Sequence, residues 1–503
     1  MLAWTIYISF LAVAVLVLLP RGSTRLARHV ALSAATAGLV VVIASIARQP
    51  PGELVTVAKL PWIPSLGIEY HLAADGISNT LLLLTGIMAV AGILFSWNLK
   101  ERTREFFAFY LALIGGAYGV FLSFDLFLLL VFYEIAIIPK YFLIAIWGST
   151  RREYGAMKLA LYSFTGSAMV LIVLLSAYVL AGGQTMNLSQ LASFPFPIHF
   201  QMWAFPVMFT GFAVLAGMWP FHTWAPTGHV AAPTGASMLL AGVVMKLGSY
   251  GCLRVAMTLF PRGMEPWGFQ VLGLGSWRGV FALLAIIGIV YGATVALVQQ
   301  DFKFVVGYSS VSHMGLVLLG LMTLNRIGMT GAVLQMFSHG IIAGLLFAVV
   351  GRMVYDRTHT RELSVLQGMH LSKAIPFAAV TFVFAAMASV GLPGFSGFVA
   401  ELQVLIGAWA AFPLLAILAG FGIIISVAYA WRAMQKAFFA DASSNSADPE
   451  KPLQPISIPE RLGASLLLAT TVTIGIYPQL LLKIIAPALN SPLFEGLRRV
   501  AGR

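Results

Sequence analysis

The sequence predicts an all-α polytopic membrane protein of about fourteen transmembrane helices. The chain has 503 residues, of which 59% are apolar. Only 10% are charged, whereas soluble domains carry about 25% charged residues. One span needs roughly 20 apolar residues. The number of apolar residues is therefore large enough for the whole chain to consist of membrane spans and the loops between them. We therefore expect residues 1–503 to form a single membrane domain.

Apolar stretches bounded by polar or Pro-containing segments define the predicted spans. In order, they are 2–20, 28–46, 76–98, 106–123, 125–147, 156–181, 203–220, 234–257, 279–298, 304–323, 328–354, 374–411, 414–438 and 462–482. The first is followed by a basic segment and lacks a small-residue cleavage site, so we expect a retained span. Residues 47–75 are expected to form an ordered outer cap, and the polar residues 440–461 a flexible inner loop.

The net charge of +12 is interpreted as membrane topology, not as a surface for nucleic acid, because cytoplasmic loops retain Lys and Arg. With both termini outside, most basic residues fall in inner loops, Lys303 among them. Arg254 is an exception that falls on the outer side. The single cysteine, Cys252, excludes disulfides and cysteine-ligated clusters within the chain.

Four ionisable side chains fall deep inside predicted spans, namely Glu134, Lys140, Lys246 and Glu401. A charge at the bilayer centre costs on the order of 2.5–3.5 kcal/mol, and such residues mark ion pathways. Lys246 has no carboxylate within four residues on its own helix, so its partner must come from another helix, or it is neutral part of the time. The alternative for the acids is a neutral carboxyl group bonded to a neighbouring helix, but we favour proton transfer.

Two predicted spans are interrupted, the seventh near Pro220 and the twelfth at Pro393 and Gly394. Proline removes an amide donor, and unwound backbone at membrane depth persists only inside protein or beside a wet cavity. Glu401 follows the second break, which suits a proton entry or exit point, although a hinge needed only for packing is the alternative. Paired interruptions are typical of inverted repeats, which we place at 106–257 and 279–438.

Histidines provide further candidates. His313 and His339 lie inside spans ten and eleven, and a neutral imidazole can pass a proton between its two nitrogens. A relay and a packing role are equally consistent with these two positions. His222 and His229 lie near the first break without a third ligand type, so bonding to exposed carbonyls is favoured over a metal site, and no metal is expected.

Several strings resemble the antiporter-like membrane subunits of respiratory complex I, in particular subunit M (mitochondrial subunit 4). They include FDLFLLLVFYE, PFHTW, APTGAS, GYSSVSHMG, GAVLQMFSHGIIAG and GLPGFSGFVAEL. The resemblance implies fourteen helices, inverted repeats and a hydrophilic axis across the middle of the membrane. It matches Glu134 to the glutamate of helix five, Lys246 to the lysine of helix eight and Glu401 to the terminal residue of helix twelve. That last residue is typically acidic in M-type subunits and lysine in L- and N-type subunits.

One departure from the family pattern concerns helix seven. The family has a lysine there that pairs with the glutamate of helix five, whereas this chain has Leu215. Lys140 is unusual for the family and is a candidate for the missing positive charge. Six residues separate it from Glu134, so the two side chains point about 120° apart on a regular helix. The family's aspartate after Trp-x-Pro is Thr227 here.

The resemblance implies a proton-translocating subunit of an NADH-quinone oxidoreductase, a redox-driven translocase of the respiratory electron-transport chain. The chain shows no nucleotide-binding fingerprint and has one cysteine, so we expect no cofactor in it. NADH, flavin, iron–sulfur clusters and quinone are expected in partner subunits. The expected partners are the N-type and L-type antiporter-like subunits and the lipid bilayer. The bacterial inner membrane is favoured over a thylakoid or mitochondrial one.

Two other functions stay open. The chain is a structural spacer with impaired conduction if Leu215 in place of the lysine interrupts the axis. It belongs to a cation/proton antiporter, a membrane-bound hydrogenase or a carbon-concentrating relative of complex I if its partner subunits are different, since these share most of the quoted strings.

Overall fold

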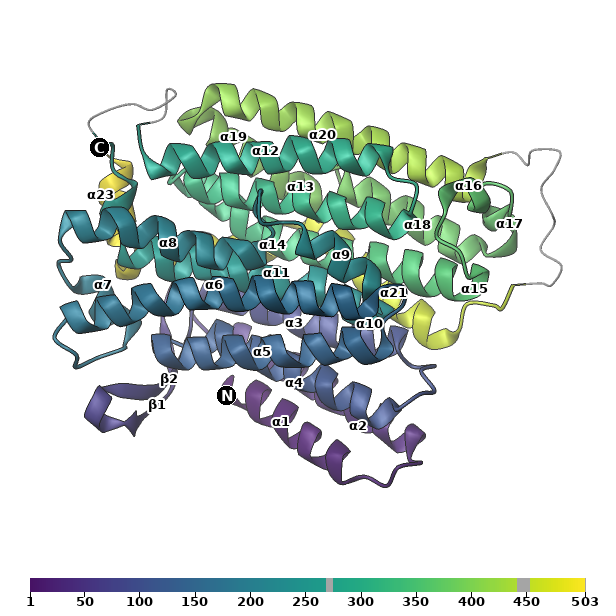
Figure 1. Cartoon of the computed structure of the whole chain (residues 1–503), viewed down its shortest axis with the longest axis horizontal. Helices are drawn as coiled ribbons and strands as arrows, with labels where there is room; N and C mark the ends of the chain where they lie inside the picture. The colour runs from purple at the N-terminus through teal and green to yellow at the C-terminus, as the bar shows by residue number, and fades with distance from the viewer. Residues whose placement is uncertain (268–274, 441–452, 503) are drawn as a thin grey trace.

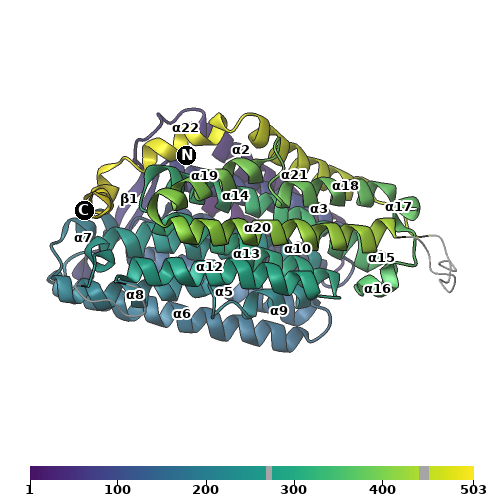
Figure 2. The ribbon, with the colours of Figure 1, turned by 90° about the horizontal axis from the view of Figure 1, so that it is seen from above.

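The computed structural model describes residues 1–267, 275–440 and 453–502, and nearly all of its helices run along the long axis of the molecule (Figure 1). One end, called the hairpin end below, carries strands β1 (Val55–Ile63) and β2 (Ile68–Ala74). The opposite end carries three short helices (Figure 2), α15 (Asp356–Thr358), α16 (Leu363–Leu366) and α17 (Leu371–Ala374). The two ends correspond to the two faces of a membrane.

Six long helices precede α8, and aspartate side chains fix where two of them begin. The six are α1 (Ala3–Leu18), α2 (Thr24–Ile46), α3 (Gly76–Phe95), α4 (Thr103–Leu122), α5 (Leu126–Trp147) and α6 (Arg152–Leu180). Asp75 accepts the amides of the first turn of α3. Asp125 accepts the amide of Leu128 at 3.0 Å. Both are N-caps, which satisfy donors that have no partner inside the helix.

The segment expected to form an ordered cap is a β-hairpin. Strands β1 and β2 pair antiparallel around a short 3₁₀ turn, η1 (Pro64–Leu66). Gly67 closes the turn with φ +62°, a left-handed conformation that favours glycine. A bridge from Leu72 to Ser123 joins the hairpin to the end of α4. The hairpin is therefore tied to the bundle, while its placement outside the membrane stays a prediction.

The first break separates α8 from the helix that carries Lys246. Helix α8 (Ile198–Ala216) ends where Gly217 adopts φ +82°, so the predicted span 203–220 was wrong at its C-terminal end. After the short α9 (Trp224–Ala231), one continuous helical rod runs from residue 234 to 257. It consists of α10 (Thr234–Leu239), the π-helical η2 (Leu240–Val244), α11 (Met245–Gly251) and the π-helical η3 (Cys252–Met257).

The second half repeats the sequence of long helices and a break. It contains α12 (Trp277–Val298), α13 (Phe302–Met322), α14 (Arg326–Phe347) with its π-helical continuation η5 (Ala348–Tyr355), α18 (Pro376–Ser389), α19 (Ser396–Ala411) and α20 (Pro413–Met434) with the π-helical η6 (Gln435–Phe439). Residues 390–395 interrupt the predicted twelfth span between α18 and α19. Breaks near Pro220 and at Pro393 and Gly394 are therefore confirmed.

The C-terminal region bends at the hairpin end. Helix α21 (Ile458–Ile476) and helix α22 (Gln479–Ala488) meet at 71°, so the straight span predicted at 462–482 was wrong. Pro478 lies at the bend, where a proline cannot donate the next helical hydrogen bond. The remaining short elements are α7 (Leu188–Ser193), η4 (Pro261–Met264), η7 (Pro492–Phe494) and α23 (Glu495–Ala501). Most of the predicted flexible loop, residues 441–452, lies outside the described residues.

The described residues include 11 helices that are long and apolar enough to cross a membrane, or 12 if α21 and α22 are counted as one span. Helices α1, α18 and α19 are apolar but shorter. The chain is therefore a polytopic all-α membrane protein. The number fourteen and the division into two inverted repeats stay predictions.

The most deeply buried helices lie in the middle of the bundle. The span of Thr234–Met257 and that of Arg326–Thr358 are each 100% buried, whereas that of α2 is 22% buried. Lys246 and His339 lie on these two central helices. The surrounding helices, α2 and α20 among them, present most of their surface outward.

Candidate functional site

Lys246 and His339 form the centre of the candidate site. Lys246 is fully buried, and its Nζ lies 2.7 Å from Nδ1 of His339 on α14. Nζ also donates to the carbonyl oxygen of Ala241. When Lys246 is an ammonium, it donates and cannot accept, so Nδ1 of His339 is then the acceptor and the neutral ring carries its proton on Nε2. The predicted partner from another helix is therefore a histidine.

The close approach of two glycines brings this pair together. A Cβ atom on Gly340 would lie 2.7 Å from the carbonyl oxygen of Gly242, and one on Gly242 would lie 3.3 Å from that of Gly340. The two helix backbones therefore touch where they cross. Lys246 lies one turn beyond Gly242, and His339 is next to Gly340. Larger residues at the crossing would separate the amine from the imidazole.

The Lys246 helix departs from α-helical geometry on both sides of the lysine. The π-helical η2 precedes it and η3 follows it. A π turn inserts one residue into the helix and leaves carbonyl groups with weaker partners, and such turns are frequent at functional sites. Ala241, whose carbonyl accepts from Lys246, lies within η2. The distorted backbone therefore supplies an acceptor to the buried ammonium.

His313 and Glu401 form a second buried pair. Nε2 of His313 lies 3.4 Å from Oε1 of Glu401 and 2.9 Å from the carbonyl oxygen of Ser389. Nδ1 of the same ring lies 2.8 Å from the carbonyl oxygen of Ser309. Both ring nitrogens thus face oxygen acceptors, which is the arrangement of an imidazolium beside a carboxylate. Tyr429 donates to Ser309 Oγ at 2.7 Å and closes this network.

The helix break builds the environment of Glu401. Ser389 is the last residue of α18, and its carbonyl accepts from His313. Gly391 has φ +70°, and a Cβ atom there would lie 2.6 Å from Oε2 of Glu401. Glycine is therefore required both by the left-handed conformation and by the approach of the carboxylate. Gln335 Nε2 contacts the other carboxylate oxygen at 3.5 Å.

The two pairs are joined by their imidazole rings. The rings of His313 and His339 stack with centroids 5.5 Å apart and planes inclined by 25°. Lys246, His339, His313 and Glu401 thus form a continuous series of contacts from the first half of the chain to the second. The sequence singled out all four residues, but gave no reason to pair them in this order.

Glu134 and Lys140 form a separate group on α5. Lys140 is 1% exposed and its Nζ donates to Ser163 Oγ of α6 at 3.2 Å. The half-buried Glu134 faces Ser167, one helical turn further along α6, and Lys140 is a cation that acts on it electrostatically. The described residues show no ion pair between the carboxylate and the ammonium, in agreement with the 120° separation expected on a regular helix.

Leu215, at the end of α8, packs against the Lys246 helix. It is 1% exposed, and its backbone passes so close to the Lys246 helix that a Cβ atom on Gly248 would lie 3.0 Å from its carbonyl carbon. Among the described residues, no hydrogen bond connects Lys140 with Lys246. An apolar side chain therefore packs against the Lys246 helix at this position.

The first break contains two buried histidines, His222 and His229, and the buried Lys303 of α13 lies against it. In the described part of the chain, both ring nitrogens of His229 are without hydrogen-bond partners, so the predicted bonding to a carbonyl group was wrong for this ring. The ring of His222 interacts with the backbone of Pro220, in agreement with the prediction. Lys303 is 2% exposed and donates to the carbonyl oxygen of Ala232 at 2.8 Å. It lies in the first turn of α13 and not in a loop, while its placement on the inner side stays a prediction. The described residues contain no group of three or more His, Cys, Asp or Glu placed to hold a metal ion.

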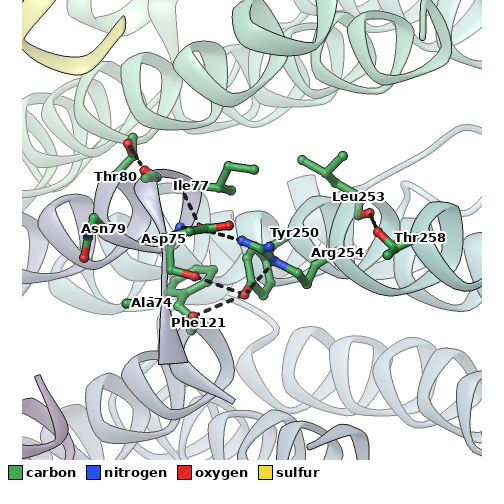
Figure 3. Close-up of polar contacts among 12 residues, drawn as sticks. Ala74, Asp75, Ile77, Asn79, Thr80, Phe121, Tyr250, Leu253, Arg254 and Thr258 are labelled. Carbon is green, nitrogen blue, oxygen red and sulfur yellow. Dashed lines mark hydrogen bonds and ion pairs between the residues drawn. The ribbon is translucent and has the colours of Figure 1, made fainter. Parts of the chain in front are cut away.

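Sequence reasoning missed a buried ion pair at the hairpin end. Arg254, counted above as an outer-side charge near the end of the predicted span 234–257, is fully buried in η3, and its Nη2 lies 2.6 Å from Oδ1 of Asp75 (Figure 3). The Tyr250 hydroxyl accepts from Arg254 Nε at 3.2 Å and donates to the carbonyl oxygen of Phe121 at 3.2 Å. The signal in the sequence was an aspartate directly before a predicted span.

Comparison with known proteins identifies similar chains. The family model described as NADH:quinone oxidoreductase/Mrp antiporter, TM, matches residues 123–426. NADH-quinone oxidoreductase subunit M of Rhodobacter capsulatus is 36% identical, over 96% of this chain and 94% of its own length. The protein of the same name from Escherichia coli (strain K12) is 36% identical over 84% of this chain and 82% of its own.

Solved structures show the same fold. A chain of respiratory complex I from Thermus thermophilus is 28% identical, with a TM-score of 0.87 and full coverage of both chains. A chain of the Mrp complex from Dietzia sp. DQ12-45-1b is 22% identical, with a TM-score of 0.86, and covers 100% of this chain and 99% of that one.

Proposed function

Because the chain belongs to the NADH:quinone oxidoreductase/Mrp antiporter transmembrane family, we propose that it is the M-type, proton-translocating membrane subunit of a bacterial NADH-quinone oxidoreductase. Its place is the cell inner membrane. The redox chemistry, with NADH, flavin, iron–sulfur clusters and quinone, belongs to partner subunits. The neighbours in the membrane are N-type and L-type antiporter-like subunits.

One observation carries the proposal, namely the unbroken series of contacts from Lys246 through the two stacked imidazoles to Glu401. A proton that leaves Lys246 can pass to Nδ1 of His339, because that nitrogen already accepts a hydrogen bond from the amine. Arrival of a second positive charge beside His313 repels the imidazolium proton toward Glu401. Charge thus moves along the membrane plane by exchange of partners at fixed positions.

Glu134 and Lys140 act at the other end of this axis. Lys140 supplies the positive charge that Leu215 does not, and Ser163 and Ser167 line the route along α6. Connection of this group to Lys246 requires water, since the contact at Leu215 is apolar. Proton transfer through this water, between the group on α5 and Lys246, is the slowest step of conduction in this proposal.

Replacement of Lys246 tests the proposal. In the assembled complex in proteoliposomes, Lys246→Ala is expected to abolish proton pumping coupled to quinone reduction by NADH while the subunits still co-purify. Lys436→Ala is the matched control. Lys436 lies in η6, outside the series of contacts from Lys246 to Glu401, and this variant is expected to pump as the native complex does. Full pumping by the Lys246→Ala complex contradicts the proposal.

A structural spacer is the second candidate, favoured by the buried position of Leu215. In that case Glu134→Gln leaves the number of protons per electron unchanged, and Leu215→Lys raises it. Under the leading proposal Glu134→Gln lowers this ratio. Membership of a cation/proton antiporter or a hydrogenase would be indicated by the subunits that co-purify with the chain.

A further inference from the structure

A cavity of about 530 Å³ opens at the hairpin end between α14, α19 and α22. This volume falls within the range of ligand pockets, roughly 300–1,000 Å³. Helix α22 forms one wall because it bends by 71° away from α21 and lies across the end of the bundle. The cavity therefore lies at the level where the ends of the helices meet lipid headgroups.

Two cations line the cavity without protein partners. Arg326 is the first residue of α14 and Lys483 belongs to α22. Both are exposed, and neither forms a hydrogen bond or ion pair with any other described residue. Arg326 also lies at the positive end of the dipole of a 22-residue helix. The charge of this cavity therefore favours an anion.

The floor of the cavity is polar and unsatisfied. Thr330 Oγ1 and Gln403 Oε1 are buried and have no hydrogen-bond partner among the described residues. A buried polar atom without a partner is destabilising, so a ligand that bonds to these oxygens is stabilised. The Gln403 oxygen accepts only, and it therefore calls for a ligand that carries hydroxyl or amine donors next to its negative charge.

The rim beside the two cations is apolar. Ile327 and Leu482 line it, and Ile327 is 49% exposed. An inorganic anion has no apolar part that could pack against this rim. A phospholipid has one, because its glycerol backbone and the first methylenes of its acyl chains can pack there. The parts of the cavity correspond to the parts of a phospholipid. The cations match the phosphate, the buried polar oxygens match a polar headgroup, and the apolar rim matches the acyl chains.

We propose that this cavity binds an anionic glycerophospholipid whose headgroup carries hydroxyl groups, as phosphatidylglycerol does. The phosphate lies between Arg326 and Lys483, and the headgroup hydroxyls donate to Gln403 and Thr330. The acyl chains leave along Ile327 and Leu482 into the surrounding bilayer. This proposal does not depend on proton translocation, because it concerns binding to the chain alone.

Binding of dioctanoyl-phosphatidylglycerol to the full-length chain in a neutral detergent tests this inference. The native chain is expected to bind this lipid at least tenfold more tightly than dioctanoyl-phosphatidylcholine, and more tightly than inorganic phosphate by a larger factor. The double variant Arg326→Gln/Lys483→Gln is expected to lose this preference. Gln403→Leu, which removes one acceptor and keeps both charges, is expected to weaken binding of phosphatidylglycerol more than that of dioctanoyl-phosphatidic acid.

The control variant Arg48→Gln/Lys59→Gln removes two positive charges at the hairpin end that do not line the cavity. It is expected to bind the lipid within twofold of the native chain. Equal affinity for phosphatidylcholine, or equally tight binding of inorganic phosphate, overturns the proposal. So does a cavity variant that binds the lipid normally but no longer co-purifies with neighbouring subunits, because the cavity would then be a protein contact.

Discussion

At Gly391, the conformation of the backbone and the position of the Glu401 carboxylate depend on each other. The residue has φ +70°, and the Glu401 carboxylate occupies the space that a side chain would need. Gly394, three residues later in the same break, has φ +98°, but a Cβ atom there would meet nothing within 4 Å. A comparison of the same substitution at these two glycines therefore distinguishes the effect of backbone strain from the effect of displacing Glu401.

Gly391→Ala is therefore expected to impair proton pumping far more than Gly394→Ala. Both substitutions place a Cβ atom in the left-handed region, at a cost of about 1–2 kcal/mol. Only the first also pushes the carboxylate away from His313. Pumping per electron in proteoliposomes, with thermal stability measured on the same samples, checks this. Equal pumping by two variants of equal stability would show that Glu401 does not need its observed position.

Residue types in the sequence were enough to find Lys246, His313, His339 and Glu401, but not their order of contact. Charged and imidazole side chains are rare inside apolar helices, so each of them stood out. Their pairing depends on the crossing at Gly242 and Gly340 and on the carbonyl of Ser389 freed by the break. Such contacts arise from tertiary packing, for which periodicity in a single chain gives no signal.

At the scale of secondary-structure elements, the ion pair of Asp75 and Arg254 joins the start of α3 to the end of the Lys246 helix. Its two partners are 179 residues apart in the chain. The sequence placed Arg254 near the end of the predicted span 234–257 but gave it no partner. The π-helical η3 keeps this part of the chain helical and inside the bundle. Positions of π turns could not be predicted from the sequence.

Arg254→Gln is expected to destabilise the chain by about 3–5 kcal/mol, since it leaves Asp75 buried without its cation. Unfolding in a neutral detergent, followed by thermal shift, measures the loss. Asp75→Asn/Arg254→Gln, which removes both charges, is expected to recover a large part of it. If the double variant is less stable than the single one, the pair does not act as described.

The hairpin contains an element with a predictable dependence on pH. Burial lowers the pKa of His71 below 6.5, the positive charge of Lys59 adds to this effect, and Glu69 opposes it. Nδ1 of the neutral ring lies 2.9 Å from Nδ2 of Asn187, which donates to it. The unfolded hairpin takes up a proton at higher pH than the folded one does. Its stability is therefore full above about pH 6.5 and falls as pH decreases toward the folded pKa.

Hydrogen exchange in β1 and β2 is expected to accelerate between about pH 7.5 and pH 5.5, after correction for the intrinsic pH dependence of exchange. In His71→Gln, which keeps an acceptor for Asn187 but does not titrate, the corrected protection is expected to be constant over this range. The same acidic loss of protection in both proteins would assign the effect to a group other than His71.

At the scale of the whole molecule, the distribution of basic residues predicts which end faces the cytoplasm. The hairpin end is expected outside and the end with α15, α16 and α17 inside. The only native cysteine, Cys252, is buried, so an introduced thiol reports with little background. Ser65, in the turn of the hairpin, and Thr150, between α5 and α6, are exposed at the two ends.

In intact cells, Ser65→Cys is expected to react with a membrane-impermeant maleimide, and Thr150→Cys to react only after the membrane is opened. The opposite pattern would reverse the topology and with it the direction of proton transfer. Protein with native Cys252 alone is the control and is expected to remain unlabelled in both conditions.

The backbone contact between Gly242 and Gly340 has a mechanical consequence for the whole bundle. Two helices that touch without intervening side chains cannot rock against each other unless they first move apart, and the packed core around them opposes that separation. The amine of Lys246 and the imidazole of His339 are thus held at a fixed distance by a rigid pair of helices. Any rearrangement during turnover must then occur in the rings, in the carboxylate beyond the break, or in water that enters beside Leu215.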